Sequence, residues 1–73
     1  MTTESLELLK KYHQRTAEAL ADFDNTMINL IKAGVKNFAD NPEYKSRKKK
    51  WRKAAKDYMG LAELLSELDK NYN

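Results

Sequence analysis

The chain has 73 residues, of which 41% are hydrophobic and 34% charged, with two glycines, one proline and no cysteine. This composition is typical of a single helical domain, and it excludes a disulfide-stabilised fold and a thiolate metal site. One histidine is too few for a histidine-cluster metal site, so we expect no metal and no other cofactor. A core of this size rarely supplies more than about 3–5 kcal/mol, so oligomerisation or very regular helix packing is expected to add stability.

The formal net charge of +3 conceals an uneven distribution. Eight of the fourteen basic side chains lie between Lys45 and Lys56, with no acidic residue among them, whereas segments 1–43 and 57–73 each carry more acids than bases. A block of like charge points to an anionic partner. No apolar stretch approaches the roughly 20 residues that span a bilayer, and the first residues lack the layout of a signal peptide. We therefore expect a soluble, cytoplasmic protein.

A first helix is predicted over about 4–38, with Thr2 or Thr3 as its N-cap. Apolar and small residues at alternating steps of three and four indicate the side of this helix that faces a partner. They are Leu6, Leu9, His13, Thr16, Leu20, Phe23, Met27, Leu30 and Gly34. Gly34 is also a candidate for ending the helix, because glycine readily adopts the left-handed conformation found there.

A turn over about 39–41 and a second helix over about 42–71 are predicted from Asn41 or Asp40 as N-cap and Pro42 at the first helical position. The inward side of this helix again follows steps of three and four. Its members are Tyr44, Arg47, Trp51, Ala54, Tyr58, Leu61, Leu65, Leu68 and Tyr72. Gly60 lies just off this line.

Two long helices joined by a short turn predict an all-α fold, namely an antiparallel helical hairpin forming a single domain. A lone hairpin buries little apolar surface, so we expect a homodimer that forms a four-helix bundle. The expected interface consists of Leu20, Phe23, Met27, Leu30, Trp51 and Tyr58. The alternative is a monomeric three-helix bundle, in which the first helix breaks between Asp22 and Thr26.

The basic segment predicts one exposed cationic face on the second helix. The expected polyanion-binding residues are Lys45, Lys48, Lys49, Arg52, Lys53 and Lys56. Such a face can contact successive phosphates, and it carries no base readout by itself. Trp51 shares the inward side with Tyr44 and Tyr58, which favours a core role over stacking on a base.

No glycine-rich phosphate loop, activated nucleophile or metal set is visible, so neither an enzyme nor a small-molecule substrate is expected. The predicted function is a small binding protein that engages nucleic acid or an acidic nucleoprotein surface. The alternative is a protein-interaction module, such as an inhibitor, adaptor or secretion co-chaperone, that binds through apolar helical faces. The hairpin layout with Pro42-Glu43-Tyr44 opening its second helix resembles the small co-chaperones of type III secretion needle subunits, from which the cationic block departs.

Overall fold

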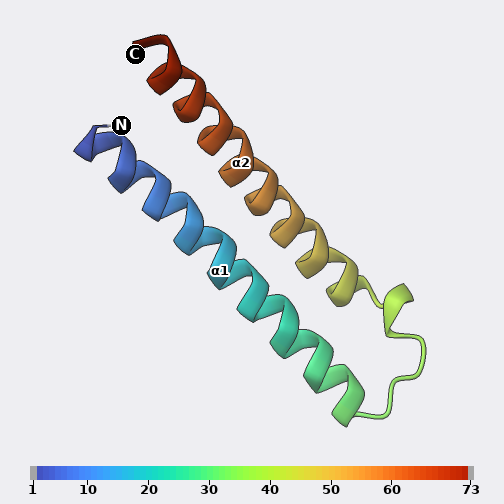
Figure 1. Cartoon of the computed structure of the whole chain (residues 1–73). Helices are drawn as coiled ribbons and strands as arrows, with labels where there is room; N and C mark the ends of the chain where they lie inside the picture. The colour runs from blue at the N-terminus through green and yellow to red at the C-terminus, as the bar shows by residue number, and fades with distance from the viewer. Residues whose placement is uncertain (1, 73) are drawn as a thin grey trace.

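The protein is an antiparallel hairpin of two long helices (Figure 1). A computed structural model describes the backbone of residues 2–72 and the side chains of residues 2–70, so the side chain of Tyr72 lies outside the described part. Helix α1 spans Thr3–Lys32, a short 3₁₀ helix η1 spans Phe38–Asp40, and α2 spans Pro42–Tyr72. The predicted all-helical hairpin is therefore confirmed.

The hairpin is elongated, with Cα extents of 55 × 18 × 12 Å and a radius of gyration of 16.4 Å. A compact chain of this length would have a radius of gyration of about 11 Å. Two helices side by side enclose little volume, and Phe23, at 7% exposure, is the one buried hydrophobic side chain within the described residues. The fold therefore depends on a narrow interface between α1 and α2.

Helix α1 ends earlier than the sequence pattern predicted, at Lys32 instead of about residue 38. Gly34 has φ +79°, and its amide donates to the carbonyl of Ile31 at 3.0 Å. The amide of Val35 donates to the carbonyl of Leu30, also at 3.0 Å. This pair of hydrogen bonds is the Schellman motif, which satisfies the last carbonyls of a helix and turns the chain away from its axis.

The three-helix alternative is wrong, because α1 runs without a break through Asp22 and Thr26. Polar side chains in this region keep helical geometry by bonding within the helix. The hydroxyl of Thr26 donates to the backbone carbonyl of Asp22 at 3.0 Å, and that of Thr16 donates to the carbonyl of Tyr12 at 3.0 Å. These bonds satisfy the hydroxyls locally, so both threonines can lie half-buried without a partner from α2.

Helix α2 begins at Pro42, and Asn41 is its N-cap. Its side-chain Oδ1 accepts hydrogen bonds from the amides of Glu43 at 2.9 Å and Tyr44 at 3.3 Å. Along α2, the residues predicted to face inward are half-buried as far as Leu65, whereas Leu68 is exposed. The ring of Tyr44 contacts Phe23 with 5.1 Å between centroids and Phe38 with 5.4 Å, which closes the turn end of the hairpin.

The side of α1 that faces α2 is rotated from the predicted one. Leu6 and Leu20 are exposed, whereas Tyr12, Ala19 and Thr26 are half-buried. His13 is also exposed, although its ring still contacts that of Tyr58 on α2. Leu9, Thr16, Phe23, Met27 and Leu30 occur in both the predicted and the observed sets. The apolar residues of α1 cover more than one side of the helix, and α2 covers only part of them.

The two glycines are expected to respond in opposite directions to substitution by alanine. Gly34→Ala should lower the free energy of unfolding by about 1 kcal/mol, because the left-handed conformation is unfavourable with a Cβ. Gly60→Ala should raise it by about 1 kcal/mol, because Gly60 is mid-helix and its Cβ would meet nothing within 4 Å. Each kcal/mol corresponds to a shift of roughly 4–8 °C in a thermal melt followed by circular dichroism. Shifts of the same sign would contradict this reading of the two sites.

Candidate polyanion-binding face

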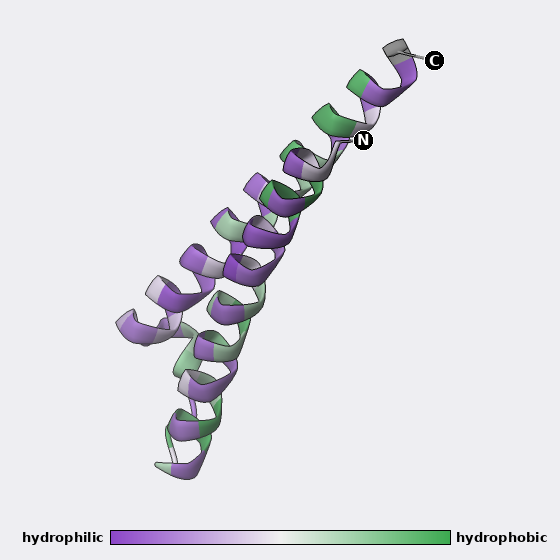
Figure 2. Ribbon diagram, turned by 90° about the vertical axis from the view of Figure 1, so that its left-hand side faces the viewer, coloured by the Kyte–Doolittle hydropathy of each residue, from purple (hydrophilic) through white to green (hydrophobic). Residues whose placement is uncertain are grey.

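The packing of α2 on α1 directs the basic segment outward. Tyr44, Trp51 and Tyr58 lie half-buried on the inner side of α2. Most of the basic residues between them fall on the outer side because the helix turns about 100° per residue, whereas Arg47 faces α1. Of the six predicted polyanion-binding residues, five are exposed, namely Lys45, Lys49, Arg52, Lys53 and Lys56. The half of α2 next to the turn is almost uniformly hydrophilic, whereas hydrophobic residues gather towards its C-terminal end (Figure 2).

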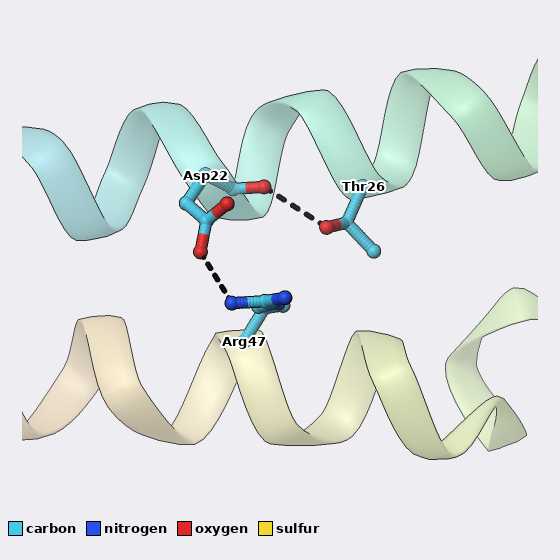
Figure 3. A network of polar contacts seen from close by, with 3 residues as sticks. All are labelled: Asp22, Thr26 and Arg47. Atoms are coloured by element: carbon cyan, nitrogen blue, oxygen red, sulfur yellow. Dashed lines mark hydrogen bonds and ion pairs between the residues drawn. The ribbon is translucent and has the colours of Figure 1, made fainter.

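Arg47 is set apart from these cations by an ion pair with α1. Its Nη1 lies 2.7 Å from Oδ2 of Asp22. Figure 3 shows the guanidinium reaching across the interface to the turn of α1 where Thr26 also bonds to the Asp22 carbonyl. Both charged side chains are partly exposed, so the pair contributes at most about 1 kcal/mol. It holds Arg47 at the interface and away from any outer partner.

Lys48 lies at the edge of the cationic face instead of at its centre. It is half-buried, and its Nζ lies 5.7 Å from the centroid of the Tyr44 ring. Trp51 packs against Phe23 with 5.7 Å between ring centroids, so the indole belongs to the hairpin interface. An indole held in this way is not offered to an unpaired base on the cationic face.

The cationic face, defined as Lys45, Lys48, Lys49, Arg52, Lys53 and Lys56, runs for about 17 Å along α2 at 1.5 Å per residue. Within the part of the chain that the structure describes, none of its members forms an ion pair with an acidic side chain. Its charges are therefore available to an external anion.

Comparison of the chain with protein-family models, curated proteins and solved structures finds no match. The resemblance to secretion co-chaperones thus gains no support from relatives, and the geometry has to carry the functional argument.

The residues predicted to form a dimer interface differ in how far their own hairpin covers them. Phe23 is buried by its own hairpin, Trp51 is half-buried against Phe23, and Tyr58 contacts the ring of His13 with 5.4 Å between centroids. Met27 and Leu30 are half-buried, and Leu20 is exposed. Of this set, Leu20 has the largest exposed fraction, at 37%.

A groove between the helices was not predicted. It is an open groove with a volume of about 730 Å³, and Ala19 and Ala54 are among its lining residues. Lys50 and Lys53 come from α2 and Arg15 from α1, with acidic side chains between them. The sequence alone could not reveal this groove, because Ala19 on α1 and Ala54 on α2 lie 35 positions apart and come together only when the helices pack. The mixed charge of the lining does not select an anion as clearly as the cationic face does.

Two other classes of site are not found in the described residues. No cluster of three or more histidine, cysteine or acidic side chains is placed to hold a metal ion there. None of the described helices is long and apolar enough to cross a membrane.

Proposed function

We propose that the protein binds nucleic acid through the cationic face of α2, without catalysing a reaction. The observation that carries this proposal is a run of mostly exposed cations on the outer side of α2, none of which forms an ion pair with an acid within the described residues. The spacing of these side chains along about 17 Å of helix suits contact with several phosphates of one backbone. A cytoplasmic location belongs to the same proposal.

The position of the face in α2 adds physical support. The cations occupy the N-terminal half of the helix, where the partial positive charge of the backbone makes acids favourable and cations unfavourable in the first turn. Glu43 follows that rule, but Lys45 in the same turn does not. The cations of this segment also repel one another, which is unfavourable for the isolated helix. Their retention is consistent with selection for binding an external anion.

The salt dependence of binding tests this proposal. With about five phosphate contacts, log K should fall against log salt concentration with a slope of about −4.5 on duplex DNA, or roughly 500-fold for a fourfold rise in salt. Fluorescence anisotropy with labelled duplex and single-stranded oligonucleotides of several sequences measures the slope. Similar affinity across sequences is expected, since phosphate contacts carry no base readout. Absence of binding at low salt would contradict the proposal.

A second candidate function, binding of a protein through apolar faces, is favoured by the exposed apolar side chains. The larger ones are Leu6, Leu8, Leu20, Ile28, Ile31, Met59, Leu64 and Leu68. The accessible surface of 5990 Å² is larger by roughly a quarter than expected for a compact monomer of this mass. The excess is larger than the roughly 800 Å² that one partner contributes to a standard interface.

The same surface supports a homodimer arranged as a four-helix bundle. Its contacts would come from the exposed apolar flank of α1, Leu20 and Ile31 included, and not from Phe23, which is already covered. Such a dimer would persist at high salt, because burial of apolar surface is little affected by ionic screening. Sedimentation equilibrium at high salt distinguishes it from a monomer, and the same apolar surface would serve an inhibitor, adaptor or co-chaperone.

A further inference from the structure

The outer side of α2 carries a line of residues in which two bases precede a glycine and two acids follow it. Residues at alternating steps of three and four share one side of a helix. Five such residues form what we call the outer stripe, namely Lys53, Lys56, Gly60, Glu63 and Glu67. All five are exposed and lie away from the half-buried Tyr58 and Leu65, and Lys53, at one end of the stripe, also borders the groove between the helices.

When a second copy runs in the opposite direction, its outer stripe presents acids where the first presents bases and bases where the first presents acids. If a second copy lies antiparallel with Gly60 opposite Gly60, then Lys53 comes opposite Glu67 and Lys56 comes within one residue of Glu63. A two-fold axis repeats each of these pairs, so four ion pairs form from one stripe. A closed two-fold contact requires this property, because the same patch must serve both partners.

Gly60 provides a second observation at the centre of the outer stripe. Its φ is not positive, and a Cβ there would meet nothing within 4 Å. Neither backbone conformation nor packing within the hairpin therefore requires a glycine at this position in the middle of α2, where glycine weakens a helix. Absence of a side chain permits another backbone to approach closely, and Gly60 lies where the axis would pass.

The charged members of the outer stripe are also free to pair with another molecule. Between residues 2 and 70, neither Lys53 nor Lys56 forms an ion pair with an acid, and neither Glu63 nor Glu67 forms one with a base. A second copy of the chain supplies the reversed order automatically, whereas an unrelated partner would have to match the pattern separately.

We propose that the outer stripe pairs antiparallel with the outer stripe of a second copy, centred on Gly60. The contact is polar and exposed to solvent, so it is weak and weakens further as salt is added. It also covers Lys53 and Lys56, which belong to the cationic face. Self-pairing and nucleic-acid binding therefore compete, a consequence that rests on the proposed function. The apolar flank of α1 is not part of this contact.

A charge-swap experiment tests the pairing. One variant carries Lys53→Glu and Lys56→Glu, which makes the outer stripe acidic, and the other carries Glu63→Lys and Glu67→Lys, which makes it basic. Sedimentation equilibrium should show association of the wild type that is lost at high salt, and neither variant alone should show that salt-sensitive step. An equimolar mixture should recover it at one to one, with at least about a tenfold stronger association than either variant alone.

Three results would overturn the pairing: a wild type with no salt-sensitive association, a double variant that still associates like the wild type, or a mixture that gains nothing. Circular dichroism of each variant checks that the hairpin is folded. Recovery in the mixture would itself exclude unfolding as the cause of the loss.

The basic variant separates this inference from the proposed function. Glu63→Lys with Glu67→Lys leaves all six members of the cationic face in place, so it should bind duplex DNA at least as tightly as the wild type while failing to self-associate. Normal DNA binding without recovery in the mixture would overturn the pairing alone. Recovery in the mixture with no DNA binding by any form would overturn the proposed function and leave the pairing standing.

Discussion

Replacing Phe23 with alanine is expected to unfold most of the protein at room temperature. Phe23 is the one buried hydrophobic side chain of the described residues, and its ring contacts Tyr44 and Trp51 at centroid distances of 5.1 and 5.7 Å. Truncation of a buried phenylalanine costs about 3–5 kcal/mol. A core of this size supplies about the same total, so little stability should remain.

Ile28→Ala is the matched control for this substitution. Ile28 lies on the same helix at 45% exposure, and its truncation should change the free energy of unfolding by about 0.5 kcal/mol. Thermal and urea unfolding followed by circular dichroism measure both variants. A Phe23→Ala protein that melts cooperatively within a few degrees of the wild type would show that stability resides elsewhere, for example in contacts between hairpins.

Reversing the charge of Lys48, Lys49 and Arg52 together is expected to remove nucleic-acid binding without unfolding the hairpin. Loss of about three phosphate contacts reduces affinity by roughly a hundredfold or more near physiological salt, before repulsion by the new acids is added. The helix should remain intact, because glutamate forms helices about as well as lysine and arginine do and because Lys49 and Arg52 are exposed. Fluorescence anisotropy and circular dichroism on the same samples measure the two effects.

The matched control reverses Lys10, Lys11 and Lys36, which are exposed on α1 and in the connecting loop. Both triple variants change the net charge equally, so a contact mechanism predicts a much smaller loss for the control. Equal losses of DNA affinity in both variants would show that net charge, and not contact with the cationic face, causes the loss. Undiminished binding by the Lys48, Lys49 and Arg52 variant would show that the cationic face faces solvent without contacting nucleic acid. It would favour the second candidate function, binding of a protein through apolar faces.

The sequence by itself determined the two-helix architecture and the outward direction of the basic segment. The start of α2 depends on a local signal, since Asn41 and Pro42 satisfy or remove backbone donors within a few residues. The inner side of α2 could be predicted because its apolar residues, Trp51 and Tyr58 among them, form a single line among charged neighbours. Once that line faces α1, helical geometry places Lys49 and Lys56 outside.

Only the tertiary structure decided which side of α1 faces α2 and where α1 ends. On α1, apolar residues occupy adjacent columns, and no local signal separates the column of Tyr12 from that of Leu20. Their burial depends on where α2 lies, which is a property of the packed pair. Apolar residues continue beyond Lys32, yet the left-handed Gly34 ends the helix there, and the rest of the connection packs Phe38 on Tyr44. The Asp22–Arg47 pair joins residues 25 positions apart, so spacing along one helix could not reveal it.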